Sequence, residues 1–263
     1  MDIKQKNENI IEVSGLTKYY NNFLAVDHIN FEVKKGGIFG FLGPNGAGKT
    51  TTIRMLTGLT KPNDGTAKIN KKDIIKQTVE AKKIIGVVTE DSNLYDELTV
   101  TDNLKFMGQL YDVSKSEREN RIKELLNVLG LENKKDVKFA KLSKGTKRKV
   151  TIAAALVHNP LILFLDEPTT GLDVLSARVL RVMIKELNKK GVTIFLTTHY
   201  IEEAEQLCDT VAIIVDGKIK TVDTPKNLKL KTKSKSLEEA FIEITGLREE
   251  IMLLEKGEKI NNE

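Results

Sequence analysis

Residues 38–50, IFGFLGPNGAGKT, join a continuous apolar run to a glycine-rich segment that ends in Lys49 and Thr50. The run Ile38–Leu42 predicts a buried β-strand, and residues 49–59 predict the helix that follows it. A loop between a strand and a helix fits the G-x-x-x-x-G-K-[S/T] pattern, in which backbone N–H groups and the helix dipole hold phosphate oxygens. The segment therefore predicts a nucleotide phosphate site.

The side chains of this loop have separate expected roles. Lys49 adds a mobile positive charge for the phosphates, and the hydroxyl of Thr50 suits Mg²⁺. The alternative is a glycine-rich turn with an incidental lysine, which is disfavoured because all eight positions and both flanking elements fit. The expected nucleotide-binding residues of the loop are Gly43, Pro44, Asn45, Gly46, Ala47, Gly48, Lys49, Thr50 and Thr51.

Two carboxylates and a histidine follow other predicted core strands. The apolar run 161–165 ends in Asp166 and Glu167, and His199 follows the run 193–196. Ligands of open α/β sheets bind at the carboxyl ends of strands, so these side chains are expected beside the phosphate loop. Adjacent side chains at a strand end point in different directions, which lets Asp166 serve the Mg²⁺ shell while Glu167 addresses an attacking water. His199 could donate a hydrogen bond to a γ-phosphate.

Length and composition fit one α/β domain with an appended lobe. The chain has 263 residues, 40% hydrophobic and 30% charged, which excludes a mainly disordered or fibrous protein. The longest apolar runs, 152–157 and 161–165, are far shorter than the roughly 20 residues of a spanning helix. The polar start MDIKQKNENI lacks a signal-peptide core, so the chain is expected to remain in the cytosol. A single cysteine, Cys208, excludes an internal disulfide and a cysteine metal cluster.

Apolar runs alternate with amphipathic stretches, which predicts an α/β fold with a sheet core. Between residues 99 and 129 the period becomes helical, with capping pairs that start at Thr99 and Ser114, so two helices are expected as a separate lobe. Residues 237–244 predict a short C-terminal helix. The remaining predicted strands are 10–13, 29–33, 66–69, 84–88, 211–215 and 218–222.

Basic residues exceed acidic ones, giving a formal net charge of +5. A basic cluster surrounds the predicted helix after Ser143, and because no aromatic residues are interleaved to stack bases, a solvated face is expected and no nucleic-acid partner. Alternating lysines at 229–235 could contact anionic headgroups, although a flexible tether is the simpler interpretation. The cluster comprises Lys141, Lys144, Lys147, Arg148 and Lys149.

The segment 142–146, LSKGT, has two interpretations. Ser143 is a good N-cap for the helical stretch that follows. The same helix start could instead be an anion site that binds a phosphate other than the one held by this chain's own phosphate loop. On this segment alone the capping interpretation is preferred.

Together these residues resemble the ATP-binding subunit of an ABC transporter over about residues 11–246. The similarity identifies residues 43–50 as a Walker A loop and residues 142–146 as a signature motif. It also identifies a Walker B strand with its catalytic glutamate at 161–167, a D-loop at 171–173 and His199 as a switch histidine. It implies that Tyr20 stacks on adenine and that Asp173 of the D-loop belongs to the nucleotide site. The implied fold is α/β, a P-loop NTPase with a RecA-like core, an antiparallel β lobe and a helical lobe at about 91–157 that contacts membrane subunits.

The resemblance also implies an assembly and a division of the chain. Two ATP-binding subunits, identical or different, pack head to tail in this family, so Ser143 and Gly145 of one chain would cover the γ-phosphate held by Lys49 of the other. Glu167 and His199 would be catalytic, with ATP and Mg²⁺ as cofactors. The partners would be integral membrane permease subunits, at the cytoplasmic face of the cell membrane. The expected segments are a polar tail at 1–9, an ABC ATP-binding domain at 10–225, and a Lys-rich linker with a short helical tail at 226–263.

Two positions depart from the family pattern. Glu90 stands where the family usually has the Q-loop glutamine, and its carboxylate could still reach Mg²⁺. In the signature, Lys144 and Thr146 replace the usual Gly and Gln, whereas the phosphate-facing serine and glycine remain.

The implied function is ATP hydrolysis that powers export through separate membrane subunits. The short chain and the segments 16–33 and 236–246 are similar to exporters of drugs, sodium, antimicrobial peptides or polysaccharides. The alternative is a soluble ABC ATPase that acts on ribosomes or DNA, which a single phosphate loop and the absence of sustained heptads between 51 and 141 disfavour. A small-molecule kinase would leave the signature, Glu167 and His199 unexplained, and a nucleotide-binding scaffold would not need Glu167.

Overall fold

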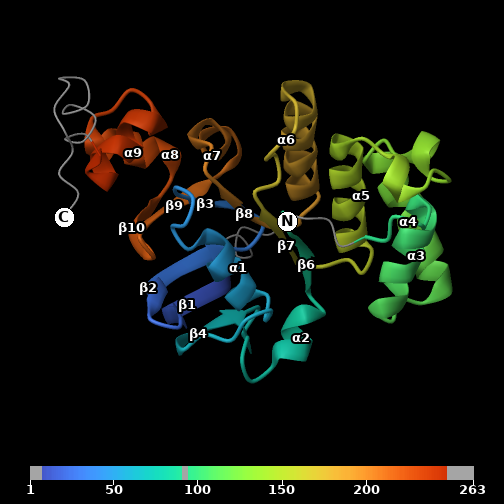
Figure 1. The fold of residues 1–263 in the computed structure, drawn as a ribbon, viewed down its shortest axis with the longest axis horizontal. Helices are drawn as coiled ribbons and strands as arrows, with labels where there is room; N and C mark the ends of the chain where they lie inside the picture. The colour runs from blue at the N-terminus through green and yellow to red at the C-terminus, as the bar shows by residue number, and fades with distance from the viewer. Residues whose placement is uncertain (1–7, 91–93, 248–263) are drawn as a thin grey trace.

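The computed structural model describes residues 8–90 and 94–247 of the chain. The polar tail up to residue 7, the start of the expected helical lobe at 91–93, and the C-terminal residues 248–263 lie outside the described residues. The described chain forms two sheets, with helices against the larger one and a helical lobe at one end (Figure 1). This arrangement confirms the expected α/β class with an antiparallel lobe and an inserted helical lobe.

The larger sheet has the strand order β10-β9-β3-β8-β7-β6, and every neighbouring pair is parallel except β10 with β9. The three central strands β3, β8 and β7 are buried along their whole length, because both faces of this sheet are covered. Their carboxyl ends consequently lie at one edge. The strands are β3 (Ile38–Leu42), β6 (Ile85–Val88), β7 (Ile162–Asp166), β8 (Thr193–Thr198), β9 (Thr210–Val215) and β10 (Lys218–Asp223).

The smaller sheet is antiparallel, with the order β2-β1-β4-β5. Its first strands are longer than predicted, since β1 spans Asn9–Tyr20 and β2 spans Phe23–Lys34. Register shifts after Val13 and after Leu16 interrupt the apolar–polar alternation, which is why the pattern predicted only the first part of β1. The other strands are β4 (Asp64–Ile69) and β5 (Lys72–Asp73).

A layer of phenylalanines joins the two sheets. Phe31 of β2, Phe39 and Phe41 of β3, and Phe195 of β8 contact one another with ring centroids between 5.4 and 6.1 Å apart. Phe164 of β7 lies 5.3 Å from Phe195. Successive side chains of a strand point to opposite faces, so the alternate leucines and isoleucines of the same strands pack against the helices. The phenylalanine layer therefore holds β3, β8 and β7 together beneath their carboxyl ends.

The helical lobe begins at the predicted caps. Thr99 accepts the N–H of Asp102 at 3.1 Å, and Ser114 accepts the N–H of Glu117 at 3.4 Å. The helices that follow pack through leucine-rich faces against the next long helix, α5. The lobe contains α3 (Val100–Leu110) and α4 (Lys115–Val128), 3₁₀ turns at Glu132–Lys134 and Phe139–Lys141, and α5 (Lys144–Leu156).

Of the other helices before β10, α1 and α2 connect the two sheets, and α6 and α7 connect strands of the larger sheet. None of the described helices is both long and apolar enough to span a bilayer. Helix α1 is shorter than the predicted 49–59, because Gly58 adopts a positive φ of 68° and ends the helical path. These helices are α1 (Lys49–Leu56), α2 (Thr78–Lys82), α6 (Val174–Lys189) and α7 (Ile201–Leu207).

The expected flexible tether at 226–235 is wrong for most of its length, because this segment contains α8 (Pro225–Thr232). The helix forms because Thr224 caps it and Pro225 occupies its first turn, where the fixed φ and missing N–H of proline are tolerated. Lys229 pairs with Glu205 of α7 and Lys231 pairs with Asp223, so the first two of the alternating lysines lie on a packed helix.

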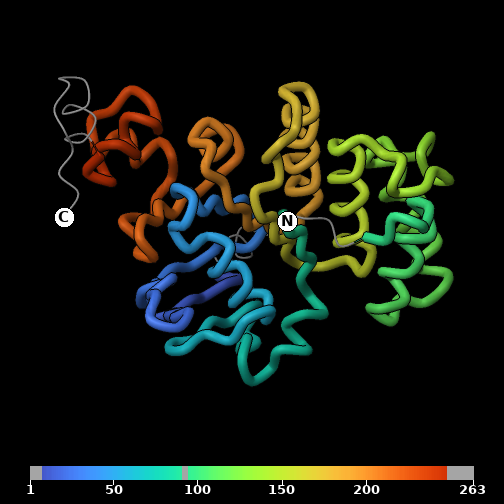
Figure 2. Tube along the Cα trace, viewed as in Figure 1, coloured from blue at the N-terminus to red at the C-terminus, as the bar shows by residue number. Residues whose placement is uncertain are grey.

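The predicted C-terminal helix is confirmed as α9 (Leu237–Thr245). Its buried residues Leu237, Ala240 and Phe241 join the core cluster on the helical side of the larger sheet. Helices α8 and α9 lie at the opposite end of the molecule from α3 and α4 (Figure 2). The C-terminal region thus extends the domain core.

Candidate functional site

The glycine-rich loop closes around its own lysine. Lys49 is the first residue of α1, and its side chain is 4% exposed. Its ammonium donates hydrogen bonds to the carbonyl oxygens of Gly43 at 2.8 Å and Pro44 at 2.9 Å. Gly48 has a φ of +100°, and a Cβ there would lie 2.6 Å from the carbonyl oxygen of Ala25, so only glycine fits. The loop thus holds a buried cation at the start of a helix, where the helix dipole also attracts anions.

A cavity of about 560 Å³ opens beside this loop. Gly43, Pro44 and Ala47 belong to the loop but are not among the described residues that line the cavity. The lining also includes Phe23 and Thr170, which the sequence analysis did not identify. The sequence-predicted residues in the lining are Tyr20, Asn45, Gly46, Gly48, Lys49, Thr50, Thr51, Glu90, Glu167 and His199.

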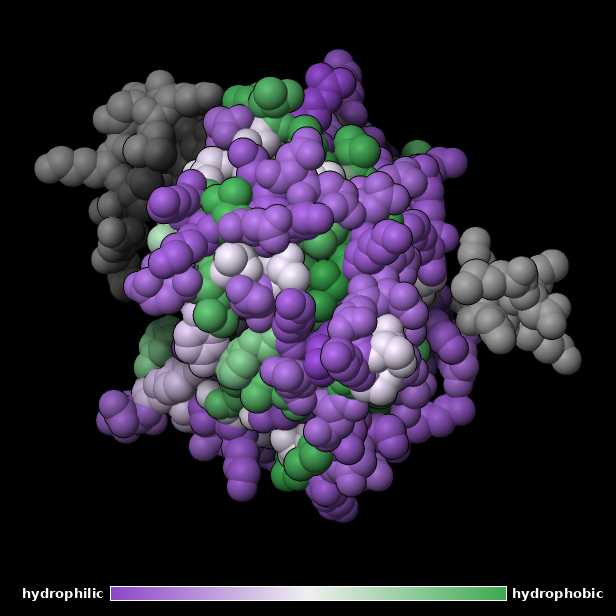
Figure 3. Space-filling view, turned by 90° about the vertical axis from the view of Figure 1, so that its right-hand side faces the viewer, coloured by the Kyte–Doolittle hydropathy of each residue, from purple (hydrophilic) through white to green (hydrophobic). Residues whose placement is uncertain are grey.

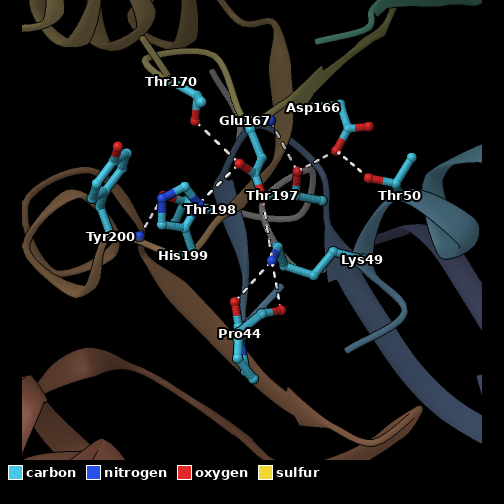
Figure 4. Close-up of polar contacts among 11 residues, drawn as sticks. Pro44, Lys49, Thr50, Asp166, Glu167, Thr170, Thr197, Thr198, His199 and Tyr200 are labelled. Atoms are coloured by element: carbon cyan, nitrogen blue, oxygen red, sulfur yellow. Dashed lines mark hydrogen bonds and ion pairs between the residues drawn. The ribbon is translucent and has the colours of Figure 1, made fainter. Parts of the chain in front are cut away.

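Glu167 follows the end of β7 and lies at the centre of the contacts in Figure 4. Its φ of +46° is in the left-handed region, which is strained for a residue with a Cβ, and its N–H donates to the hydroxyl of Thr197 at 3.0 Å. One carboxylate oxygen lies 3.2 Å from the ammonium of Lys49. The other accepts the hydroxyl of Thr170 at 3.1 Å and lies 2.9 Å from Nδ1 of His199. The carboxylate is therefore held in the cavity between a cation and a histidine.

The surroundings of Glu167 favour its ionised form. Burial alone would raise the pKa of this carboxyl, because it removes water from the charged form. The charge and the hydrogen bond of Lys49 act in the opposite direction, helped by His199 and Thr170, and leave the pKa of Glu167 below its ordinary value. A carboxylate that is charged at neutral pH can orient a water molecule and accept its proton.

Oxygen ligands gather where β7 ends beside the start of α1. The hydroxyl of Thr50 donates to Oδ1 of Asp166 at 3.3 Å, and the hydroxyl of Thr197 donates to the same oxygen at 2.6 Å. Glu90 is exposed and, with Thr50 and Asp166, lines an adjoining cavity of about 270 Å³. Hydroxyl and carboxylate oxygens fit Mg²⁺, which takes its other ligands from water and phosphates. In the part of the chain that the structure describes, there is no group of three or more His, Cys, Asp or Glu side chains that could hold a metal ion.

Arg148 holds the backbone next to Glu90. Its guanidinium donates to the carbonyl oxygens of Thr89 at 2.6 Å and Glu90 at 2.9 Å. The side chain is buried, so the expectation that the whole basic cluster forms a solvated face is wrong at this residue. The reason is that α5 packs against β6, which brings Arg148 to the backbone where that strand ends. A residue of α5 is thereby linked to the rim of the cavity.

An aromatic pair forms one wall of the cavity. Tyr20 and Phe23 are partners across the β1–β2 hairpin, and they are 41% and 65% exposed. The ammonium of Lys18 lies 5.4 Å from the centre of the Tyr20 ring. Exposed aromatic faces can stack on a flat ring such as adenine.

The predicted nucleotide-binding residues of the signature motif and the D-loop do not line this cavity within the single chain. Ser143 and Gly145 line a separate pocket of about 180 Å³, and Ser143 accepts the N–H of Thr146 at 3.3 Å, as a cap does. Asp173 caps α6 by accepting the N–H and the hydroxyl of Ser176 at 2.9 and 2.6 Å. These bonds lower the pKa of the Asp173 carboxyl. Capping accounts for these residues in one chain, and their contact with nucleotide stays a prediction about a second chain.

Comparison with known proteins adds independent findings. Residues 26–170 match the family model described as ABC transporter. The chain is 38% identical over 242 residues to the "Probable multidrug ABC transporter ATP-binding protein YbhF" of Escherichia coli K12, an alignment that covers 90% of this chain and 42% of YbhF. It is 39% identical over 219 residues to the linearmycin resistance ATP-binding protein LnrL of Bacillus subtilis 168, covering 83% of this chain and 70% of LnrL. The chain thus spans less than half the length of YbhF.

A solved structure shows the same fold. The structure of an ATP-binding subunit of an ABC transporter matches with a TM-score of 0.81 and 32% sequence identity. The match covers 90% of this chain and 99% of that one. The structural similarity therefore extends beyond residues 26–170, which match the family model.

Thr197 supports both carboxylates from the neighbouring strand, which gives a first prediction. We expect Thr197→Val to lower the turnover of ATP roughly tenfold or more, because it leaves the Glu167 N–H without its acceptor and removes a bond to Asp166. Phosphate release by the purified chain would measure this loss.

The matched control is Thr193→Val on the same strand. Thr193 is as buried as Thr197, and its hydroxyl accepts the N–H of Gly36, far from the carboxylates. Both variants should lower the midpoint of urea unfolding. Only Thr197→Val should also slow the turnover of ATP by the folded chain. Equal turnover of the two variants would contradict the supporting role.

Proposed function

The chain belongs to the ABC transporter family, and on this premise we propose that it hydrolyses ATP to ADP and phosphate and so powers export through separate membrane subunits. The observation that carries the proposal is the ionised carboxylate of Glu167, held between Lys49 and His199 beside the phosphate loop. A site that only bound nucleotide would not need a charged base in this place. The names of the relatives, a multidrug transporter protein and a linearmycin resistance protein, favour export.

ATP fits the cavity in one orientation. The triphosphate lies against the loop, where its oxygens replace the carbonyl partners of Lys49, whose ammonium also lies 3.2 Å from Glu167. The adenine lies against Tyr20 and Phe23, whose exposed rings line the same cavity. Thr50, Asp166 and Glu90 would hold Mg²⁺, which would supply positive charge to the phosphate oxygens.

The side chains then divide the work of hydrolysis. Glu167 orients a water molecule whose oxygen attacks the γ-phosphorus, and it accepts the proton that the water loses as the bond to the bridging oxygen breaks. Because an ionised carboxylate only accepts hydrogen bonds, Nδ1 of His199 donates to Glu167, which fixes the ring. Nε2 donates to the γ-phosphate in the imidazolium form, because only that form carries an N–H on both ring nitrogens. Lys49 compensates the charge that develops on the phosphate oxygens.

A second ATP-binding subunit, identical or different, completes the site. Its Ser143 and Gly145 cover the γ-phosphate, and Asp173 of each chain lies at the same interface. The exposed apolar residues beside Asp173 support this arrangement, since Val174 is 84% and Leu175 is 71% exposed. ATP thus joins the subunits, and its hydrolysis separates them.

The helical lobe is the surface we assign to the membrane permease subunits. Its end of the molecule is mainly hydrophilic, with hydrophobic side chains in separate patches (Figure 3). Tyr95 and Leu110, from this region, are 53% and 61% exposed. The chain would work at the cytoplasmic face of the membrane, with an ATP-binding domain at 10–225, against which α8 and α9 pack, and a helical subdomain at about 91–157. The transport names of the relatives disfavour action on ribosomes or DNA.

The role of Glu167 gives a second prediction. Glu167→Gln should lower ATP turnover at least about 100-fold, because the amide cannot accept the proton of water. ATP binding should persist, because the loop and Lys49 are unchanged, so subunit pairs with trapped ATP should accumulate. Phosphate release and filter-bound radiolabelled ATP would measure the two effects.

A matched control is Glu186→Gln, which neutralises an exposed carboxylate on α6. It should hydrolyse ATP like the unmodified chain. If Glu167→Gln kept the turnover of the unmodified chain, Glu167 would not be the catalytic base. If the unmodified chain bound ATP without hydrolysing it, the chain would be a nucleotide-dependent scaffold.

The carboxylate of Glu90 gives a third prediction. Glu90→Gln should raise the Mg²⁺ concentration needed for half-maximal turnover several-fold, because it removes a charged ligand from the expected metal shell. Glu97→Gln, also at an exposed carboxylate, should leave the curve unchanged. Identical Mg²⁺ curves for Glu90→Gln and the unmodified chain would remove Glu90 from the metal shell.

A further inference from the structure

Glu203 is a buried carboxyl that the proposed hydrolysis does not use. It lies in α7, four residues after His199, and its side chain is 0% exposed. Neither carboxylate oxygen has a hydrogen bond of ordinary length and angle among the described residues. Burying a polar group in this way is unfavourable, so its place in the fold needs an explanation.

The groups that face Glu203 come from three parts of the chain. The hydroxyls of Thr169 and Thr198 are close enough to stabilise its ionised form, as are the charges of Arg181 on α6 and of His199. Burial is the largest influence, and it raises the pKa of Glu203 above its ordinary value. A protonated carboxyl can donate one hydrogen bond and accept others, so it can bond to both hydroxyls at once.

The two threonines belong to segments with different expected tasks. Thr169 precedes residues 171–173, which we assign to the contact with the second subunit. Thr198 directly precedes His199, which lies on the wall between the nucleotide cavity and a second cavity of about 540 Å³. Glu203 and Thr169 line this second cavity, so the carboxyl lies on the side of His199 away from the nucleotide.

We propose that Glu203 is a positioning residue that couples the segment 171–173 to His199. The inference rests on the proposed ATPase function. A small movement that brings the hydroxyls of both Thr169 and Thr198 into hydrogen-bond geometry satisfies the buried carboxyl, so the two segments are more stable when they move together. Contact of the second subunit with 171–173 then fixes the ring of His199, which already lies 2.9 Å from Glu167 in the single chain.

Two substitutions of Glu203 test this coupling in the full chain. Glu203→Leu removes an unsatisfied buried polar group, so it should leave the thermal midpoint unchanged or higher, yet lower kcat about tenfold with KM for ATP within about twofold. Glu203→Gln keeps a donor and an acceptor in the same place, so it should retain kcat within about threefold. Glu203→Leu would then lower turnover without lowering stability, which a purely structural role of Glu203 would not produce.

Glu202 provides the matched control, because it is an exposed carboxylate on the same helix. Glu202→Leu and Glu202→Gln should leave both kcat and KM unchanged. The proposal is overturned if Glu203→Leu keeps the kcat of the unmodified chain, if Leu and Gln lower kcat equally, or if Glu203→Leu is less stable. An unmodified chain without ATP turnover would instead overturn the proposed function.

Discussion

The buried ammonium of Lys49 is the group on which the rest of the site depends. A charge that is 4% exposed needs partners in place of water, and the carbonyl oxygens of Gly43 and Pro44 together with Glu167 provide them. The loop must therefore curl back over its own helix, and β7 must end beside it. The same charge holds Glu167 in its ionised form. Phosphate binding and the activation of water thus depend on one interaction.

The parallel sheet explains how these groups meet. In the register of β3, β8 and β7, Leu42 lies opposite Thr198, and Thr197 lies opposite Asp166, so each strand delivers its last residues to the same edge. The phenylalanine layer packs these strands against the antiparallel sheet, which contributes Tyr20 and Phe23 to the cavity wall. The protein therefore assembles the site from strand ends that are far apart in the sequence.

The sequence predicted those features whose signal is local. The phosphate loop, the carboxylates after a buried strand and the helix caps could be read from neighbouring residues. Phe23 and Thr197 could not, because their roles arise from hairpin pairing and from parallel strand register. The lysine alternation before residue 235 suggested a tether, although Thr224 and Pro225 together are a helix-start signal that could have predicted α8.

The most direct test of the central claim is the effect of Lys49→Ala on ATP binding and on subunit pairing. We expect the substitution to weaken ATP binding at least about tenfold, because hydrogen bonds to a charged group contribute about 1.5–3 kcal/mol. Analytical ultracentrifugation with a slowly hydrolysed ATP analogue should then show nucleotide-dependent pairs for the unmodified chain and for the exposed control Lys76→Ala, and none for Lys49→Ala. Pairing and ATP turnover by Lys49→Ala at the level of the unmodified chain would contradict the assignment of this site.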